Sequence, residues 1–342
     1  MVKVLKKDQI ESFLSKLKEN YELYGPKKKG FEVEWAKLDG SLLFDFKNSS
    51  LSPKSFFFPQ TECMMHFKND PNDPEGMIMK PEPELDSKRI LFNIRPCDAK
   101  AFSLLDKVFM KDEASLDVYW KDKRDKTILI GLGCNNPSPT CFCLSVGCGP
   151  FSEEGLDVLA VDLGDRVLFK GITERGKEII SSLDDAEESD IKNAEELKKN
   201  AESKITRKVE LDNILSKEIL EVYEIPLWDR IHETCLNCGA CTFYCPTCHC
   251  FDIQDEVQGD YGRRVRNWDT CMSWLFTQHA SGHNPRGTKK DRVRQRFMHK
   301  FKYIPFRLNG EIGCVGCGRC IVRCPVNIDV RDVVNQMNQQ LK

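Results

Sequence analysis

Two runs of cysteine in the last third of the chain constrain its fold more than any other feature. Each run has the spacing C-x2-C-x2-C-x3-C followed by proline, the spacing with which cysteine thiolates hold 4Fe–4S clusters. Three closely spaced cysteines let one turn of backbone reach three irons of a cubane. Electron transfer through iron–sulfur clusters is therefore the leading hypothesis. The runs consist of Cys235, Cys238, Cys241 and Cys245, and of Cys314, Cys317, Cys320 and Cys324.

The fourth cysteine of each run is expected to serve the other run. In proteins with two such clusters, this cysteine ligates the cluster that the other run holds. Zinc is the main competing metal, but its four-cysteine sites typically use two C-x2-C pairs separated by a longer loop. We expect two 4Fe–4S clusters, one on Cys235, Cys238, Cys241 and Cys324, and the other on Cys314, Cys317, Cys320 and Cys245.

The composition is that of a soluble globular protein, with 40% hydrophobic and 30% charged residues. The net charge of −2 neither requires nor excludes a nucleic-acid partner. Disulfide-dense secreted scaffolds are short, whereas this chain has 342 residues and shows neither a signal peptide nor an apolar run long enough for a membrane span. We therefore expect the 17 cysteines to be metal ligands and reduced thiols of a cytoplasmic protein, from an anaerobe because exposed clusters are sensitive to oxidation.

The first half of the chain has the pattern of a mixed α/β domain. Short apolar stretches between turn residues favour strands, whereas apolar residues at a spacing of three and four favour a helix. Two of the strands end at loops that carry cysteine. The expected strands lie within residues 31–58, notably 42–46 and 56–59, and at 89–94, 127–132 and 156–169, and the expected helix covers 99–109.

A charged segment separates this half from the cysteine runs. Residues 181–217 are rich in Ala, Glu and Lys and lack Pro and Gly, which predicts one or two solvated helices. The 68 residues between Cys245 and Cys314 exceed what a compact ferredoxin fold needs, so a mostly helical dicluster module fits better. We expect an α+β protein with a mixed domain at 1–180, a helical linker at 181–225 and a helical ferredoxin-like domain at 226–342.

Four cysteines outside the runs are candidates for a third cluster. Cys97 follows one expected strand, and Cys134, Cys141 and Cys143 follow the next, so their loops can converge. Buried free cysteine also behaves as a small hydrophobe, but packing alone explains less in loops rich in Pro, Asn and Ser. Cys148 could replace one member of the set, and Cys63 is less well placed.

Other residues near the runs have simpler interpretations. Cys248, Cys250 and Cys271 are read as buried thiols, although they could line the clusters and tune their potential. His249 lies among the ligands, but eight cysteines already suffice for two clusters, so a surface or packing role is favoured.

The segment 286–302 is strongly basic, with eight Lys or Arg residues and one Asp. Basic clusters can bind nucleic acid, yet no recognised nucleic-acid motif or ladder of aromatic residues accompanies this one. Its charge could instead offset the negative charge of a cubane with four thiolates, or dock an acidic partner. We favour these two roles and expect no nucleic-acid partner.

Several catalytic and nucleotide-binding motifs are absent. There is no phosphate loop, no complete dinucleotide fingerprint after a strand, no G-x-S-x-G and no H-E-x-x-H. We expect no catalytic residue and no bound flavin or nucleotide on this chain, so that flavin or nicotinamide chemistry takes place on other subunits.

The motifs together resemble one family. It comprises the beta subunit of cytoplasmic sulfhydrogenases and the A subunit of anaerobic sulfite reductase, and is similar to the iron–sulfur subunit of flavin complexes that feed heterodisulfide reductase. The resemblance covers the chain from about Phe56 to its end. The motifs are RPCD at 95–98, CNNPSPTCFC at 134–143, CLNCGACTFYCPTCHCFD at 235–252, NWDTCM at 267–272, GHNPR at 282–286 and CVGCGRCIVRCP at 314–325.

The resemblance implies an electron-relay subunit of an oxidoreductase complex. Electrons would pass between a flavin subunit that binds NAD(P) and a hydrogenase, a sulfite reductase or a heterodisulfide-reductase-type subunit. It also implies a helical dicluster module and a third cluster on Cys97, Cys134, Cys141 and Cys143. Two alternatives stay open: a self-sufficient oxidoreductase with an open iron in the N-terminal domain, and a cluster-containing nucleic-acid-binding protein.

Overall fold

The computed structural model describes the chain except for residues 71, 73–76 and 82–84. An eight-stranded sheet forms the N-terminal half. Its strands are β1 Val2–Lys6, β2 Glu22–Lys29, β3 Glu32–Lys37, β6 Arg89–Ile94, β7 Thr127–Leu132, β8 Val158–Asp162, β9 Arg166–Gly171 and β10 Asp184–Asp185. The strand order is β10-β1-β9-β8-β7-β6-β2-β3, with β8, β7, β6 and β2 parallel and antiparallel strands on either side.

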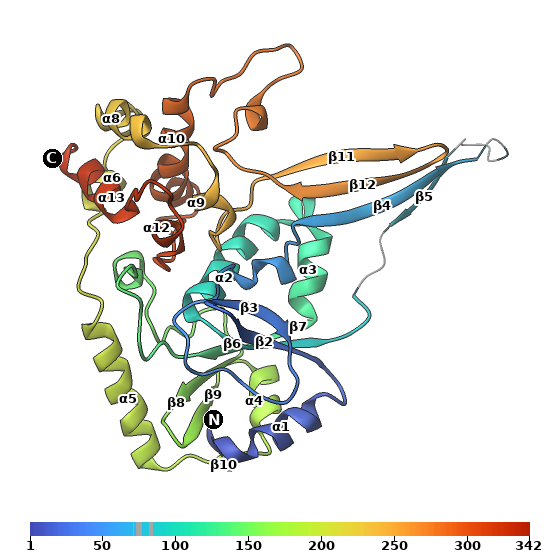
Figure 1. The fold of residues 1–342 in the computed structure, drawn as a ribbon, viewed down its shortest axis with the longest axis vertical. Coiled ribbons are helices and arrows are strands. Elements are labelled where there is room, and N and C mark those ends of the chain that lie inside the picture. The colour runs from blue at the N-terminus through green and yellow to red at the C-terminus, as the bar shows by residue number, and fades with distance from the viewer. Residues whose placement is uncertain (71, 73–76, 82–84) are drawn as a thin grey trace.

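Helices cover both faces of the sheet (Figure 1). The covering helices are α1 Ile10–Leu17 and α4 Glu174–Ile180 on one face, and α2 Pro96–Phe109 and α3 Val118–Asp125 on the other. Successive side chains of a strand point to opposite faces, so Ile90 packs with the first pair and Leu91 with the second. Every residue of β6 and β7 is therefore buried, which confirms the two strands expected at 89–94 and 127–132.

Other predictions for this half had mixed outcomes. The expected helix lies within α2, and residues 156–169 form most of the β8–β9 hairpin. The strands expected at 42–46 and 56–59 are wrong, because both segments are loops. Side chains, rather than a neighbouring strand, bind the first loop: Asn93 Nδ2 donates to Leu43 O at 2.9 Å, and Arg95 donates to two carbonyl groups that follow. The apolar pattern there reflects packing of a loop.

The charged segment forms helices, as expected. Residues 181–217 contain α5 Glu188–Ser203 and α6 Asp212–Ser216, and α7 Ile219–Tyr223 follows them. Most of α5 is exposed, and Figure 1 shows it running along the side of the sheet toward the C-terminal half.

The C-terminal half is a set of helices around one core that includes Trp228, Phe297 and Phe301. Its elements are α8 Leu227–Thr234, α9 Ala240–Phe243, α10 Lys289–Met298, the π-helical turn His299–Tyr303, α11 Ile304–Arg307, α12 Arg319–Val322 and α13 Val330–Gln339. The expected α+β class is confirmed. Among the described residues, no helix is long and apolar enough to cross a bilayer.

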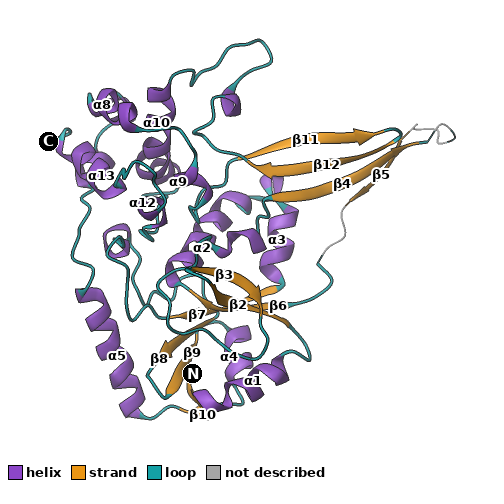
Figure 2. Ribbon diagram, in the orientation of Figure 1, coloured by secondary structure: helices purple, strands orange, loops and turns teal. Residues whose placement is uncertain are grey.

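A four-stranded antiparallel sheet, which the sequence did not lead us to expect, joins the two halves. Its strands are β4 Thr61–Asn69, β5 Met77–Pro81, β11 Phe251–Gln258 and β12 Tyr261–Trp268, in the order β11-β12-β4-β5. We call this sheet the arm. Figures 1 and 2 show it projecting away from the rest of the molecule.

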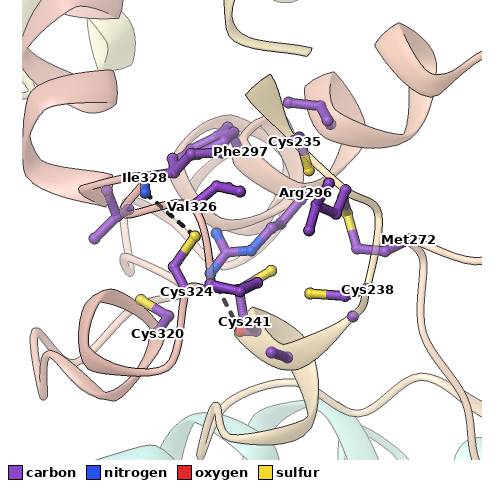
Figure 3. Close-up of a pocket in the computed structure, with 16 residues that line it drawn as sticks. Cys235, Cys238, Cys241, Met272, Arg296, Phe297, Cys320, Cys324, Val326 and Ile328 are labelled. Atoms are coloured by element: carbon purple, nitrogen blue, oxygen red, sulfur yellow. Dashed lines mark hydrogen bonds between the residues drawn. The ribbon is translucent and has the colours of Figure 1, made fainter. Parts of the chain in front are cut away.

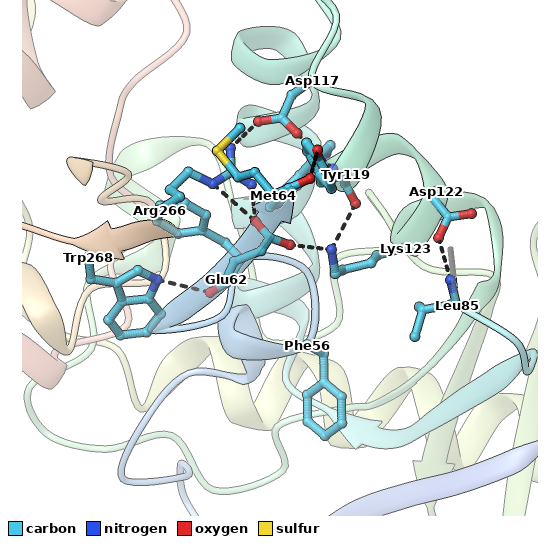
Figure 4. Close-up of polar contacts among 12 residues, drawn as sticks. Phe56, Glu62, Met64, Leu85, Asp117, Tyr119, Asp122, Lys123, Arg266 and Trp268 are labelled. Carbon is cyan, nitrogen blue, oxygen red and sulfur yellow. Dashed lines mark hydrogen bonds and ion pairs between the residues drawn. The ribbon is translucent and has the colours of Figure 1, made fainter. Parts of the chain in front are cut away.

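Buried ion pairs anchor the base of the arm (Figure 4). Arg266 of β12 donates to Glu62 of β4, with Nε at 3.0 Å from the carboxylate, and also to Asp117, the N-cap of α3. Lys123 of α3 bonds to the second oxygen of Glu62. Trp268 Nε1 donates to a backbone carbonyl at 2.9 Å. Because the carboxylates are buried against cations, the arm is fixed in register on the N-terminal half.

Replacing one cation of this network should destabilise the protein strongly. In the variant Arg266→Met, Glu62 and Asp117 lose a buried partner, which typically costs about 3–5 kcal/mol of unfolding free energy. Arg264→Met on the same strand is the matched control, because its ion pair with Asp255 is exposed and contributes about 1 kcal/mol or less. Urea unfolding measures both. A control as destabilised as Arg266→Met would contradict this account.

Candidate functional site

The four cysteines expected for the first cluster line one cavity, here called site 1, together with Cys320 (Figure 3). Cys235 and Cys238 lie on the turn between α8 and α9, Cys241 lies in α9, and Cys324 follows α12. The cavity measures about 50 Å³. The structure thus brings together the four residues expected for the first cluster. Apolar walls surround them, formed by Met272, Val293, Phe297, Val326 and Ile328.

The other four cysteines of the runs line a second cavity, site 2. Cys314, Cys317 and Cys320 lie on the turn before and into α12, and Cys245 comes from the end of the first run. The cavity measures about 10 Å³. The fourth cysteines are therefore exchanged between the runs, in the arrangement expected from their spacing.

A third cavity, site 3, lies where the sheet meets the C-terminal half. Cys97, Cys134, Cys141 and Cys143 line it, and its volume is about 20 Å³. Cys97 follows β6, and the other three cysteines follow β7. They meet because the carboxyl ends of these adjacent parallel strands lie at one edge of the sheet. The set matches the four residues expected together. Cys148 is buried outside the lining, and Cys63 lies on β4 in the arm.

The two cysteine turns share a backbone conformation. In each, the residues before and after the second cysteine have positive φ: 56° at Asn237 and 75° at Gly239, and 65° at Gly316 and 76° at Gly318. Only Gly, and less readily Asn, adopts this conformation without strain. The turn wraps the backbone so that N–H groups face sulfur.

Three such N–H groups donate to cysteine sulfur. Asn237 N lies 3.4 Å from Cys235 Sγ, and Gly316 N lies 3.5 Å from Cys314 Sγ. A third bond, 3.2 Å long, joins the amide of Ile328 to Cys324 Sγ. Hydrogen bonds to cluster sulfur stabilise negative charge and raise the reduction potential. The backbone of these turns is therefore suited to anionic thiolates.

The three sites adjoin one another in the order 1, 2, 3. Cys320 and Arg296 line both site 1 and site 2. Cys317 lines both site 2 and site 3. Site 2 is thus the middle member of a continuous series.

Arg296 and Lys300, both from the basic segment, are buried at these sites. Arg296 Nη2 donates to Cys241 O at 3.2 Å, but its Nε and Nη1 have no partner among the described residues. Figure 3 shows its guanidinium group between Cys241 and Cys324. Leaving buried donors unpaired is costly, so these two N–H groups fit an anionic group held in the cavities. Lys300 Nζ donates to Thr247 Oγ1 at 2.7 Å and lines site 2.

The pKa values of these groups reflect their mutual interaction. Burial opposes the charge of Arg296, but the thiolates of Cys241 and Cys320 outweigh it and raise its pKa well above the ordinary value. Burial raises the pKa of Cys314 and of Cys141 to about 12. Thiols buried in this way stay protonated unless a strong positive charge, such as that of iron, stabilises the thiolate. Within the described part of the chain, no group of three or more His, Cys, Asp or Glu side chains is arranged for a single metal ion.

The rest of the basic segment is occupied by internal contacts. Arg292 donates to two backbone carbonyls of the preceding turn, and Arg294 pairs with Asp291 and bonds to Tyr223. Lys290 pairs with Asp229. Of the two roles favoured for this segment, the positions of Arg296 and Lys300 support the stabilisation of buried thiolates.

A buried ion pair joins site 2 to site 3, and the sequence analysis missed it. Arg319, next to Cys320, donates to both oxygens of Asp98, next to Cys97, at 2.6 and 2.7 Å. Arg319 Nη2 also bonds to Asn48 Oδ1 at 2.7 Å. The only signal in the sequence was that each charged residue directly adjoins a cysteine of its motif.

Several residues near the sites have structural surroundings. His249 lies between the rings of Phe109 and His299, and burial lowers its pKa to about 4, so the expected packing role is supported. Lys54, also missed, donates to Cys245 O at 3.2 Å and Cys248 O at 2.7 Å, and burial lowers its pKa to about 8. Cys250 and Cys271 contact the C-terminal core.

Comparison with known proteins bears on these sites directly. Residues 234–328, which include both cysteine runs, match the model of a 4Fe-4S dicluster domain. The chain is also 29% identical to sulfhydrogenase 2 subunit beta of Pyrococcus furiosus over 346 residues, which cover 98% of each protein. This chain is a homologue of a sulfhydrogenase beta subunit. The resemblance inferred from its motifs is thereby confirmed, and the dicluster match supports iron–sulfur clusters in this chain. No solved structure matches it.

Substitution of Gly316 should disturb site 2 and site 3 together. A Cβ atom there would lie 2.5 Å from backbone atoms of Cys143. Gly316→Ala should cost about 1–3 kcal/mol of overpacking in addition to the strain of positive φ. Gly259→Ala is the control, because its φ of 61° is similar but no atom lies within 4 Å of the added Cβ. Unfolding free energy and iron content should both fall further in Gly316→Ala. Equal effects would show that backbone strain alone is responsible.

Proposed function

We propose that this chain is the electron-relay subunit of an oxidoreductase complex, with one 4Fe–4S cluster at each of its three sites. The observation that carries the proposal is the series of three adjoining cavities, each of which is lined by the four cysteines expected for one cluster. The dicluster match supports clusters at the two sites within residues 234–328. The proposal of a third cluster, at site 3, rests on a further set of four cysteines at the edge of the sheet.

The chain supplies ligands, positive charge and shielding. Each cluster, when bound, supplies transfer of one electron at a time. The thiolates fix its position, the N–H groups of the cysteine turns donate to sulfur, and apolar side chains exclude water from site 1. Arg296 and Lys300 offset the added negative charge at sites 1 and 2. No acid or base is required of this chain.

The two ends of the series face different surroundings. Cys238 at site 1 is exposed. Cys134 and Cys141 at site 3 are half-buried. We propose that electrons enter or leave through these two outer sites and that site 2 connects them.

The partners are proposed from the homologue and the motifs. Sulfhydrogenase 2 subunit beta is by its name one subunit of a larger complex. We propose a flavin subunit that binds NAD(P) on one side. A hydrogenase, a sulfite reductase or a heterodisulfide-reductase-type subunit would lie on the other. We also propose a cytoplasmic location in an anaerobe, because no disulfide joins any of the 17 cysteines and exposed clusters are sensitive to oxidation.

The structure gives less support to the two alternatives. All four cysteines expected at site 3 line its cavity, which favours a fully ligated cluster over one with an open iron. Internal ion pairs and hydrogen bonds engage much of the basic segment, which leaves less charge for nucleic acid. We retain the proposed domains 1–180 and 226–342 with the linker 181–225, and note that strands of the arm come from both.

Iron content tests the number of clusters. Anaerobically purified chain should contain about twelve irons, and Cys134→Ala/Cys141→Ala should reduce this to about eight. Cys148→Ala is the control, because this buried residue lies outside the lining of site 3, and it should leave the iron content unchanged. About eight irons in the unaltered chain would refute the third cluster. Stoichiometric zinc without iron would refute the proposed function.

Loss of the positive charge of Arg296 should shift two potentials. Arg296→Gln should lower the reduction potentials of both C-terminal clusters by tens of millivolts, because a unit charge about 10 Å away contributes about 1.7 kcal/mol at an effective dielectric constant near 20. Redox titration followed by electron paramagnetic resonance measures the shift. The third cluster and the control Arg292→Gln, which lines neither cavity, should change little. A shift confined to one C-terminal cluster would contradict a shared role.

A further inference from the structure

The outer strand of the arm has an open edge. Strand β11 pairs with β12 on one side and ends the order of the sheet on the other. Every residue from Asp252 to Gln258 is exposed. Outward-facing N–H and C=O groups on such a strand are available to another chain.

This edge lacks the lysine, proline and bulge that commonly prevent pairing, and its only charges are acidic. Strand β11 has eight residues, FDIQDEVQ, with no Lys and no Pro. Its register with β12 is continuous, and the irregularity in β12 lies on the side of β4. Long, regular edges of this kind are pairing sites unless charge, proline or a bulge blocks them. The edge is therefore competent to accept a strand.

An apolar row crosses the arm beside this edge. The registers place Val257, Gly262, Phe67 and Met79 opposite one another on the four strands, on one face. The ring of Phe67 occupies the space above Gly262. Val257 is 65% exposed and Met79 64%, and Ile253 on the same face is 45% exposed. Exposed apolar surface of this kind marks protein interaction sites.

The charge of the edge selects the occupant. Strand β11 carries Asp252, Asp255 and Glu256 and no basic residue. Antiparallel pairing of two copies would bring these acids against one another, which is unfavourable. A strand with basic residues would be attracted instead. Asp255 and Glu256 also form exposed ion pairs with Arg264 and Arg263 of β12, so a basic strand would share these carboxylates with the arginines.

We propose that β11 binds an extended segment of another subunit by strand addition, with basic and apolar residues alternating in that segment. This inference rests on the proposed function, because it takes the chain to be one subunit of a complex. Main-chain hydrogen bonds would supply affinity, and the apolar row and acidic edge would supply specificity.

The arm leads directly to site 2. Strand β11 begins one residue after Cys250, and β12 ends at Trp268. The ammonium group of Lys54 lies 4.0 Å from the Trp268 ring and donates to Cys245 O. A subunit bound to the arm is thus anchored to the backbone that carries a ligand of site 2.

Hydrogen exchange on the native complex tests the proposal. The outward amides of residues 252–258 should exchange slowly in the complex and at least about tenfold faster in the isolated chain. Ile253→Lys/Val257→Lys should weaken association of the isolated chain with the subunits dissociated from that complex by at least tenfold, and raising the salt concentration should weaken association of the unaltered chain. Leu220→Lys on α7 is the control, since its exposure of 67% matches that of Val257 and it lies away from the arm.

Iron content measured in the same samples separates the two proposals. Unchanged iron with weakened association supports strand addition. Equal exchange in both states, unaltered affinity of the arm variant, or purification of the iron-loaded chain without partners would each overturn it and leave the proposed clusters standing. A dimer of this chain that the arm variant disrupts would overturn the basic partner in favour of a second copy. A chain without iron would refute the proposed function, whatever the arm binds.

Discussion

The exchange of fourth cysteines between the two runs is the constraint on which the C-terminal half depends. Cys245 reaches the turn of Cys314, and Cys324 reaches the turn of Cys235, so segments far apart in the chain must lie side by side. Helices α9 and α12 follow from this, since each is a short turn that continues from its cysteines. Helix α10 packs against α8, and its Arg296 lines both cavities.

Buried sulfur and buried cations explain one another. Burial raises the pKa of the Cys314 thiol, which keeps it neutral unless positive charge compensates, and burial alone would lower the pKa of Arg296 and Lys300. The neighbouring cysteine sulfurs offset this cost of burial, so Arg296 and Lys300 keep their positive charge. A basic segment that could have been a surface for nucleic acid is therefore partly interior, and its sequence position next to the second run is explained by packing.

The N-terminal half is coupled to this arrangement by polar contacts. Asp98 follows Cys97 at the end of a buried strand and forms a two-oxygen ion pair with Arg319, so that sites 2 and 3 share a wall. The ion pair of Arg266 and Glu62 couples the arm to the N-terminal half in the same way. Buried ion pairs contribute little net stability but are costly to break. They fix register between halves that the sequence suggested were independent.

The sequence by itself determined the cysteine sets, the two buried strands and the family, because cluster ligation and strand burial impose local spacings that can be read directly. Only the tertiary structure decided the pairing of β12 with β4, the loop held by Asn93 and Arg95, and the places of Arg296, Arg319 and Lys54. These depend on contacts between residues far apart in the chain, and the pattern of one sequence does not record which side chain will meet which.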